Sequence, residues 1–592
     1  MNRRVLSDIH GDQLRDFSAD RRLLLLSAMA LVTGTCGAVA AWALLELIAL
    51  FTHLAYFRTL SAGPYAFAHA RLGPMSIIVP AAGGVIVGLM ARYGSEKIRG
   101  HGIPEALESI LVGESRIAPR IAFLKPLSSA IAIGTGGPFG AEGPIIMTGG
   151  AIGSLFAQLF DLTAAERKTL LVAGAAAGMT GVFGTPVAAV LLAVEALLFE
   201  WKPRSLVPVA VSALVAAAWR PWLVGPWPLF PLAGAPTLPS WGLALCAAVG
   251  AVAGLQSALM SAALYRVEDV FQRLPIHWMW WPALGGIVVG LGGWYDPAVL
   301  GVGYDNIRAL IGASMSAGAA LSLLIAKAVV WVVALASGTS GGVLAPLLMM
   351  GGALGALEAH VLPFGDAGFW ALVAMSAVLS GTLRTPLAAT VFGVELTGDL
   401  HVMPALLAAC AASFATTVLI MRRSILTERL ARRGQHLTYE YAVDPFAVMR
   451  VTEIMSTPAD SLPASMTIGD AITFFETDAE TARHKSYPIV DRAGCLLGIV
   501  SRADVLRWTR EGWESIDTLG DHSHSADIVV GFADEIVAQL ADRMAAADIG
   551  RAPIVDRASG KLVGLVARRD LLRVRTHAAA QERKPGRASR VR

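Results

Sequence analysis

The segment PIIMTGGAIGSLFA (residues 144–157) returns about 200 residues later as PLLMMGGALGALEA (residues 346–359). A second pair follows the same spacing: GVFGTPVAA (181–189) is matched by GTLRTPLAA (381–389), and each copy leads to a Val-Glu pair, ending at Glu195 or Glu395. Two related membrane halves, each with a Gly/Pro-broken hydrophobic segment at the same place, are typical of a transport site between the halves. The alternative is that small-residue patterns simply recur in closely packed helices.

The composition predicts a membrane protein. The chain is 55% hydrophobic and 16% charged, and it contains 60 glycines. Many apolar stretches approach the roughly 20 residues that a spanning helix needs, and several are broken by Gly or Pro. Examples are 23–51, 75–90, 170–198, 206–219, 243–264 and 402–421. We therefore expect more than ten helical segments.

The charges and cysteines narrow the function class. Five arginines precede the first apolar stretch without a small-residue cleavage site, which predicts a retained, cytoplasmic N-terminus. The net charge of +3 carries no nucleic-acid signal. The four cysteines are scattered and show no metal or disulfide spacing.

The C-terminal region reads as a soluble α/β domain with its own repeat. SYPIVDRAGCLLGIVSRAD (486–504) parallels RAPIVDRASGKLVGLVARRD (551–570), and each copy predicts a strand, a turn, a second strand and a helix. Amphipathic helices are expected before the copies, near 468–476 and 534–547. This unit resembles a tandem of CBS domains, which are adenine-nucleotide-sensing modules.

The CBS resemblance implies a possible adenine nucleotide as ligand. The Gly-x-x-Ser-x-x-Asp pattern is intact at Ser501 and Asp504, which would meet phosphate and ribose. The second copy keeps Asp570 but has Ala567 at the hydroxyl position, which predicts one competent and one degenerate site. A purely structural CBS pair without ligand is the alternative.

Three short motifs in the membrane region relate it to a known family. Gly100-His101-Gly102-Ile103-Pro104, Gly140-Ala141-Glu142-Gly143-Pro144 and Gly342-Val343-Leu344-Ala345-Pro346 occur in that order. They resemble the signature loops of the CLC family of chloride channels and chloride/proton exchangers, over roughly residues 21–435. The resemblance implies an all-α membrane domain of two inverted-repeat halves with broken helices, a pore in each subunit, and a homodimer with its CBS pairs in the cytoplasm.

The predicted domain limits follow from these matches. They are a cytoplasmic segment 1–20, a membrane domain 21–436 with halves at about 21–225 and 240–436, a linker 437–447, CBS domains at 448–510 and 523–575, and a basic tail 576–592. We expect the protein in a lipid bilayer, as an inner (plasma) membrane protein of a bacterium. The resemblance implies chloride and protons as the transported species and leaves other small anions open.

The glycine-rich loops suit an anion that must bind and leave again. Backbone N–H groups at the N-termini of broken helices offer donors and a partial positive charge, and glycine allows close approach. A proline that follows fits the first helical turn. We expect the N–H groups around Gly102–Ile103, Gly143 and Val343–Leu344 to line the path, with packing alone as the alternative.

Glu142 is the strongest candidate for a functional residue. A carboxylate at a helix N-terminus inside a membrane is costly unless it has a function. By resemblance it is the external gating glutamate: ionised, it occupies an anion site, and protonated, it swings out and admits chloride. The chemistry agrees, because a carboxylate is itself an anion that the same donors hold. A structural capping role is the alternative.

Two departures from the family pattern concern the inner end of the path. His101 stands where the family usually has a serine that coordinates the inner anion, and an imidazole N–H can still donate. The alternative is that His101 turns aside. Leu426 falls where the family often has a tyrosine that closes the inner site, and leucine cannot donate a hydrogen bond.

The third departure concerns protons. Exchangers of this family usually have two acidic residues after the Pro-x-Ala run, and the second relays protons. Here Ala196 occupies that relay position, while Glu195 aligns with the first acid and matches Glu395. Glu200 lies about one turn further and is a weaker substitute. Loss of the relay favours channel-like or loosely proton-coupled transport, with a proton-coupled chloride exchanger as the alternative.

Other function classes find less support. A CBS-regulated cation transporter should carry several carboxylates along its pore, and this region offers few. No metal site, required cofactor or enzyme is expected, because the sequence shows no nucleophile–base pair, zinc-protease motif or phosphate loop. Lys125 and Lys327 lie in apolar sequence and either line an electropositive path or snorkel to an interface.

Overall fold

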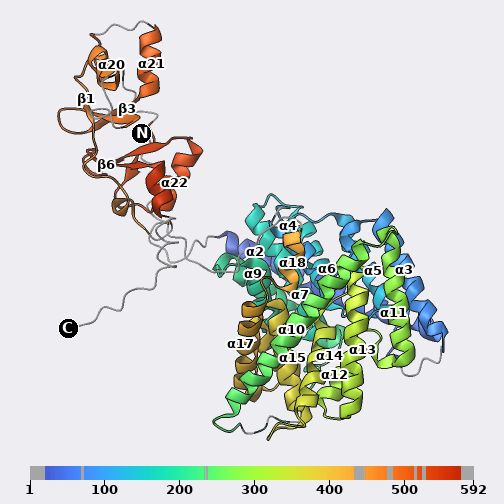
Figure 1. Cartoon of the computed structure of the whole chain (residues 1–592). Coiled ribbons are helices and arrows are strands. Elements are labelled where there is room, and N and C mark those ends of the chain that lie inside the picture. Colours follow the sequence, from blue (N-terminus) through green and yellow to red (C-terminus); the bar gives the residue numbers. More distant parts are fainter. Residues whose placement is uncertain are drawn as a thin grey trace. The chain divides into compact units, whose positions relative to one another are not determined.

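The computed structural model describes residues 21–67, 73–111, 113–232, 238–432, 449–476, 484–511, 516–522 and 528–574, with the single residues 234, 236 and 446. The chain divides into two compact units, one within Gly11–Tyr439 and one that includes Glu440–Arg592. We call them the helical unit and the α/β unit (Figure 1). The predicted segment 1–20, the tail 576–592 and nearly all of the linker 437–447 lie outside the described residues.

The helical unit is built from two series of helices that repeat the same order. The first contains α2 (Arg22–Thr52), η1 (His53–Phe57), α3 (Met75–Tyr93), η3 (Glu96–Ile98), α4 (Ile103–Leu111), α5 (Pro119–Gly134), α6 (Glu142–Ala157), α7 (Ala164–Phe183), α8 (Pro186–Ala193), η4 (Val194–Leu198) and α9 (Pro203–Leu223). The second contains α10 (Gly242–Gln272), η5 (Trp278–Trp280), α11 (Trp281–Tyr295), η6 (Pro297–Val299), α12 (Tyr304–Ile311), α13 (Ala317–Ala336), α14 (Leu344–Glu358), α15 (Ala367–Leu383), α16 (Pro386–Thr397), η7 (Leu400–Val402) and α17 (Met403–Ile420), and α18 (Ile425–Arg432) follows.

The two series correspond helix by helix. Each opens with a helix of 31 residues, α2 and α10. In the first series α2 packs against α7 and α9, and in the second α10 packs against α15 and α17. The repeat seen in the short motifs therefore extends over eight helices in each half, from α2–α9 to α10–α17.

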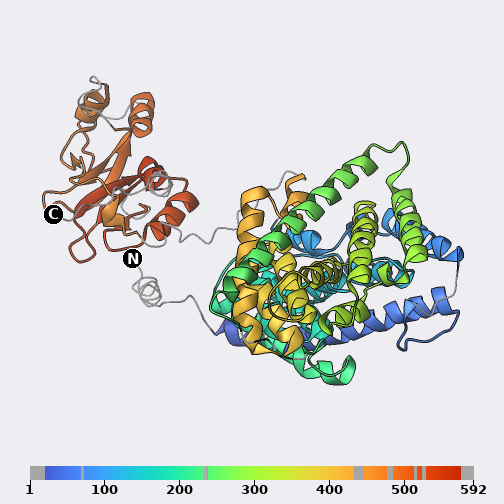
Figure 2. The same ribbon diagram turned by 60° about the horizontal axis from the view of Figure 1, so that its bottom comes forward.

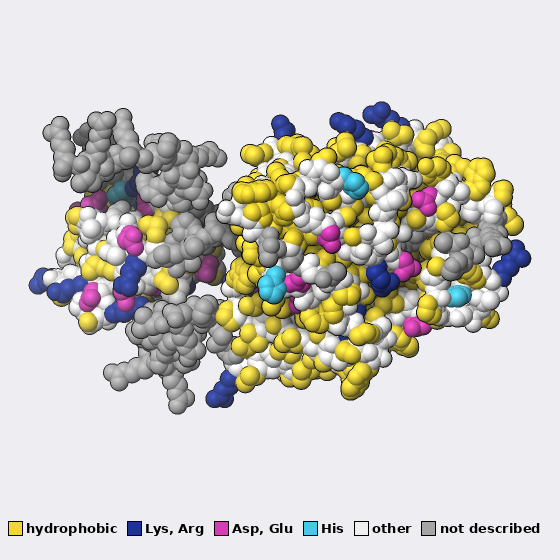
Figure 3. Space-filling model, turned by 90° about the horizontal axis from the view of Figure 1, so that it is seen from below, with side chains coloured by type: hydrophobic (Ala, Val, Ile, Leu, Met, Phe, Trp, Pro, Cys, Tyr) yellow, Lys and Arg dark blue, Asp and Glu magenta, His cyan; other side chains and the backbone are white. Residues whose placement is uncertain are grey.

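Six helical segments of the described chain are long and apolar enough to cross a membrane. Shorter apolar helices, among them α8, α14, α15 and α16, accompany them. Figure 3 shows one face of the molecule on which apolar side chains cover most of the helical unit and charged side chains are sparse. Such a surface suits a hydrocarbon environment.

Glycine and proline break the apolar sequence where the pattern predicts. The stretch 170–198 is one apolar run in sequence, but α7 ends at Phe183 and Gly184 adopts a φ of +74°. Pro186 then starts α8 at a position where its missing N–H costs no hydrogen bond. The same break separates α15 from α16.

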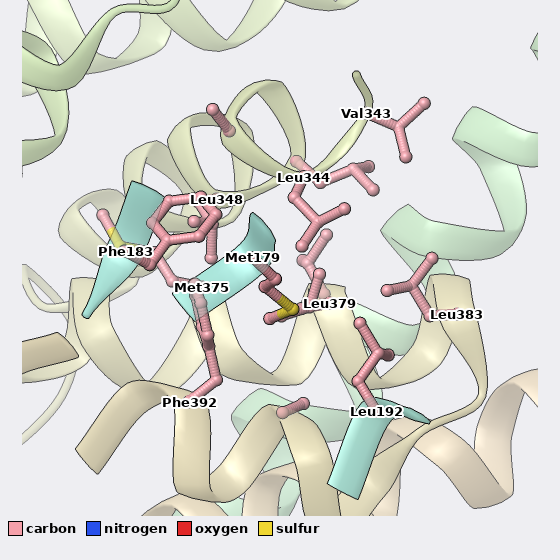
Figure 4. Close-up of a cluster of buried hydrophobic side chains, with 14 of the residues drawn as sticks. Met179, Phe183, Leu192, Val343, Leu344, Leu348, Met375, Leu379, Leu383 and Phe392 are labelled. Atoms are coloured by element: carbon pink, nitrogen blue, oxygen red, sulfur yellow. The ribbon is translucent and has the colours of Figure 1, made fainter. Parts of the chain in front are cut away.

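A buried apolar cluster joins the two halves. Met179 and Phe183 come from α7 and Leu192 from α8. Figure 4 shows them beside residues of the second half, namely Val343, Leu344, Leu348, Met375, Leu379, Leu383 and Phe392. All ten belong to one core cluster, so the helices that carry the glycine-rich motifs are fixed by packing between the halves.

The α/β unit contains two small sheets of the same design (Figure 2). In the first, β1 (Leu462–Pro463) runs parallel to β2 (Ser486–Val490), which pairs antiparallel with β3 (Leu496–Ser501). In the second, β4 (Gly531–Phe532), β5 (Arg551–Val555) and β6 (Leu562–Ala567) repeat this order. The helices are α20 (Ile468–Glu476), α21 (Arg502–Glu511) and α22 (Val537–Ala546), and a short 3₁₀ turn, η8 (Val451–Glu453), precedes the first sheet.

The two sheets of this unit join through their hairpin turns. Leu562 donates its N–H to the carbonyl oxygen of Gly494 at 3.0 Å, and Leu496 donates to that of Gly560 at 3.3 Å. Both glycines have positive φ, which allows the tight turns. Arg551 also donates to the carbonyl oxygen of Ser486 at 3.0 Å. The predicted pair of αβ repeats is thus one compact unit.

Candidate anion site

The three glycine-rich loops meet in the helical unit. Gly140 donates its N–H to the carbonyl oxygen of Gly342 at 3.1 Å, and Gly342 donates to that of Gly140 at 2.8 Å, in an antiparallel bridge. Gly100 pairs with Ser340 in a parallel bridge. The loops lead into α4, α6 and α14, so the N-termini of three helices converge on one place.

Close backbone approach explains the glycine at position 143. A Cβ atom there would lie 2.0 Å from the carbonyl oxygen of His101 and 3.1 Å from the Cα atom of Gly342. Gly102, with a φ of +91°, approaches the carbonyl oxygen of Gly143 in turn. No side chain fits between these loops, so the backbone itself forms the walls of the site.

Glu142 lies at this convergence with its side chain fully buried. Its Oε1 accepts the N–H of Ala345 at 2.9 Å, so the carboxylate from the start of α6 is held by the N-terminus of α14. Its Oε2 is buried and has no hydrogen-bond partner among the described residues. The carboxylate therefore occupies an anion position between two positive helix ends.

The N–H groups that hold anionic oxygens differ in part from those expected. Ala345, which sequence reasoning did not single out, donates to Glu142, next to the expected Val343 and Leu344. The N–H of Gly102 donates to Oε2 of Glu105 at 3.1 Å, so a carboxylate of the chain itself caps α4. The remaining predicted residues, Ile103, Pro104, Gly143, Pro144 and Pro346, are buried in the first turns of the three helices.

A cavity of about 340 Å³ leads to the His101 loop. Its charged lining residues are Arg99, Glu268, Arg429 and Arg432, and each arginine also forms an ion pair with a carboxylate of the chain. His101 also lines it, and its Nδ1 is buried without a hydrogen-bond partner in the described part of the chain. We call it the His101 cavity, and a ring nitrogen that carries a proton there can donate a hydrogen bond to an anion.

The second departure from the family pattern, Leu426, lies in a turn that side chains from neighbouring helices hold in place. Leu426 is fully buried at the start of α18. The hydroxyl of Tyr265, from α10, donates to the carbonyl oxygen of Ile425 at 2.6 Å and so tethers the same turn. Arg429 pairs with Glu105 at 3.3 Å, which ties α18 to α4. Tyr265 and Arg429 were missed because they lie outside the motifs.

Neither buried lysine snorkels to an interface. Lys125 in α5 donates to the carbonyl oxygens of Ile98 and Gly100 at 2.8 and 2.7 Å. Lys327 in α13 donates to those of Val299 and Gly301 at 2.8 and 3.0 Å. Each lysine anchors the loop before α4 or α12, so the two form a repeated anchor rather than a lining of free positive charge.

Glu195 and Glu395 cap each other's helices across the two halves. Glu195 accepts the N–H groups of Leu387 and Ala388 at 3.2 and 2.9 Å, at the start of α16. Glu395 accepts those of Val187 and Ala188 at 3.0 and 2.8 Å, at the start of α8. These reciprocal contacts give both carboxylates a structural role as helix caps.

The predicted relay position carries no titratable group. Ala196 is 1% exposed, inside the π-helical turn η4. Glu200 accepts the hydroxyl of Ser205 at 2.6 Å and pairs with Lys202 at 3.3 Å and Arg204 at 3.8 Å. Because ionic partners surround Glu200, its carboxylate is stabilised in the charged form.

In the α/β unit the three predicted ligand residues act as helix caps. Ser501 donates its hydroxyl to Oδ2 of Asp504 at 2.6 Å, and Asp504 also accepts the N–H of Ser501 at 2.9 Å. Asp570 accepts the N–H of Ala567 at 2.9 Å and is 7% exposed. Within the described residues, no group of three or more His, Cys, Asp or Glu side chains is placed to hold a metal ion.

With this geometry in place, comparison with known proteins identifies the family. The family model described as voltage gated chloride channel matches residues 83–418. The chain belongs to the voltage-gated chloride channel, or CLC, family. The CBS domain model matches residues 451–511 and 524–577, so the α/β unit is a CBS pair.

Individual relatives agree with this assignment. The voltage-gated ClC-type chloride channel ClcB of Shigella flexneri is 28% identical over 378 residues, which cover 60% of this chain and 87% of that protein. ClcB of Escherichia coli is 28% identical over 373 residues, with the same coverage of both proteins.

Solved structures show the same CLC fold. A slow cyanobacterial Cl⁻/H⁺ antiporter is 21% identical, with a TM-score of 0.62 over 70% of this chain and 99% of that chain. A eukaryotic CLC transporter is 20% identical, with a TM-score of 0.56 over 93% of this chain and 98% of that chain.

Proposed function

We propose that this chain transports chloride across a membrane through a CLC-type pore, with Glu142 as the gate. The observation that carries the proposal is the buried Glu142 carboxylate, held by the N–H of Ala345 where the loops before α6 and α14 pair. The donors that hold a carboxylate also suit chloride, so the two compete for one site. Protonation of Glu142 weakens its hold on the donors and favours chloride.

The His101 cavity is the proposed inner entrance. Three arginines line it, and because a guanidinium carries five N–H donors, more than its ion pair uses, these side chains can also donate to an anion. From this cavity an anion meets His101, whose Nδ1 is unused among the described contacts, before it reaches the Glu142 site. Leu426 offers no hydroxyl at this point, so His101 and the backbone supply the donors.

Channel-like or loosely proton-coupled transport is the favoured mode. Ala196 cannot carry a proton, and the ionic partners of Glu200 disfavour a replacement relay. Proton-coupled exchange is the second candidate, because one of the solved structures that share this fold is that of a Cl⁻/H⁺ antiporter.

A liposome experiment tests the proposal and separates the modes. The full-length protein is reconstituted, a chloride gradient is imposed, and chloride and proton movement are recorded together for the wild type, Glu142→Gln and the surface control Glu114→Gln, whose side chain is 66% exposed. Chloride flux that rises in Glu142→Gln and is unchanged in Glu114→Gln supports the gate. Uphill proton movement driven by chloride makes the protein an exchanger, and absence of chloride flux refutes the proposal.

Regulation and assembly form the remaining part of the proposal. The protein is proposed to be a homodimer in the bacterial inner membrane, with the N-terminus and the CBS pair in the cytoplasm. An adenine nucleotide is proposed to bind at Ser501 and Asp504, with Asp570 marking the weaker site. Calorimetry with ATP and AMP tests this, since binding lost in Ser501→Ala supports the site and absence of heat for both nucleotides refutes it.

A further inference from the structure

The hydroxyl of Tyr304 is a buried polar group without a partner. Tyr304 is the first residue of α12, and its ring packs edge-on against Phe183, with 6.3 Å between ring centroids, and Phe230, at 5.9 Å. Its Oη is buried and makes no hydrogen bond with any described residue. A buried hydroxyl left unpaired destabilises the folded state, so its retention calls for a reason.

A second unpaired polar atom lies near it. Gly303, next to Tyr304, lies against the side chain of Met349 in α14, one turn beyond Ala345, whose N–H holds Glu142. The Tyr304 hydroxyl and the Glu142 carboxylate also interact electrostatically. Oε2 of Glu142 is likewise buried and unpaired among the described residues. The other charged or titratable groups that interact with Tyr304 are Tyr65 and Arg220, and the guanidinium of Arg220 already donates to the carbonyl oxygens of Gly225 and Pro226 at 2.7 and 2.9 Å.

Tyr304 also lines a cavity, of about 730 Å³, which we call the Tyr304 cavity. The loop before α3 lines it, whereas Arg99, after α3, lines the His101 cavity, so the two cavities lie at opposite ends of α3. The titratable and charged residues of the lining are Glu46, Tyr65, Asp296, Asp305 and Arg308. Tyr304 thus lines this cavity from the start of α12, which packs against α14, the helix whose N-terminus holds Glu142.

We propose that the Tyr304 hydroxyl receives the Glu142 carboxyl group when it leaves the N–H of Ala345. The inference rests on the proposed function, because only a carboxyl group that moves needs a second partner. A phenol hydroxyl both donates and accepts, so it bonds the carboxyl group in either protonation state. Tyr304 is therefore a positioning residue that acts through Glu142 by stabilising its withdrawn position.

This role is tested by introducing Tyr304→Phe both into the wild type and into the Glu142→Ala variant. Chloride efflux from liposomes that hold the full-length protein is measured from about pH 4.5 to 7.5 for the wild type, Tyr304→Phe and the control Tyr93→Phe, whose residue is 79% exposed. Phenylalanine keeps the ring contacts with Phe183 and Phe230. Loss of one hydrogen bond predicts efflux about five-fold slower in Tyr304→Phe at the pH of half-maximal wild-type efflux, with that midpoint moved to lower pH. Tyr93→Phe should match the wild type.

The Glu142→Ala background decides between a role through Glu142 and any other role. Without the carboxyl group, Tyr304→Phe should change efflux by less than about two-fold, because the hydrogen bond has no acceptor. An equal slowing in both backgrounds, or none in the wild-type background, overturns the inference while chloride transport stands. A wild-type protein that moves no chloride refutes the proposed function itself, which is a distinct result.

Discussion

The reciprocal caps of Glu195 and Glu395 should hold the two halves of the helical unit together. Each carboxylate accepts two backbone N–H groups at 2.8–3.2 Å from the other half. A hydrogen bond to a charged group contributes about 1.5–3 kcal/mol net, and a negative charge at a helix N-terminus adds about 0.3–1 kcal/mol. The pair is thus a large local contribution to the free energy of unfolding.

The substitution Glu395→Gln removes the charge but keeps one acceptor oxygen. We expect it to lower the free energy of unfolding by about 2 kcal/mol, within the range of about 1.5–3 kcal/mol for one hydrogen bond to a charged group and in its lower half because the side chain is partly exposed. Glu195→Gln should cost a similar amount. The double variant should lose about 3 kcal/mol, less than the sum, because both caps join the same two helices, α8 and α16.

Equilibrium unfolding in mixed detergent micelles measures these changes. The 14 tryptophans provide the fluorescence signal. Glu96→Gln is the matched control: the Glu96 side chain is 67% exposed and pairs only with Arg99 in the described ion pairs, so a change within about 0.5 kcal/mol is expected. If Glu195→Gln and Glu395→Gln also stay within that margin, or if their effects add fully, the caps do not couple the halves as argued here.

Four further outcomes follow from the same geometry. Lys125→Met should slow chloride efflux from liposomes about ten-fold, because the His101 loop loses both carbonyl anchors, and unchanged efflux would show that the anchor is dispensable. Ala196→Glu should introduce chloride-driven proton movement, recorded with a pH electrode, and its absence would contradict the relay reading. Gly143→Ala should abolish efflux, because its Cβ would meet the His101 carbonyl oxygen at 2.0 Å, whereas Gly318→Ala, with no atom within 4 Å of its Cβ, should be silent; a functional Gly143→Ala would refute the tight packing. Hydrogen bonds from Ser559 hold the pKa of Asp556 below its usual range. Its stabilisation should therefore be present above about pH 4 and lost as pH falls through the lower folded pKa, so thermal unfolding of wild type and Asp556→Asn should converge in acid, and a gap that does not narrow as the pH falls below about 4 would contradict this.

The sequence by itself determined the plan of the molecule. Repeated short motifs predicted two related membrane halves, and Gly-Pro breaks predicted where apolar runs end, because these residues restrict the backbone locally. The same local logic predicted the αβ repeats of the CBS pair and marked Glu142. In each case the signal lies within a few consecutive residues, because backbone propensities and short motifs depend on local sequence.

Only the tertiary structure decided which groups meet. The N–H that holds Glu142 belongs to Ala345, more than 200 residues away, and the N–H of Gly102 is taken by Glu105. Lys125 and Lys327 read as charges in apolar sequence, but folding turns both into loop anchors. Tyr304 carries no motif, and its unpaired hydroxyl is visible only once α12 packs against α14 and α15. Such contacts join distant segments, and their geometry is set by the packing of whole helices, which local sequence does not encode.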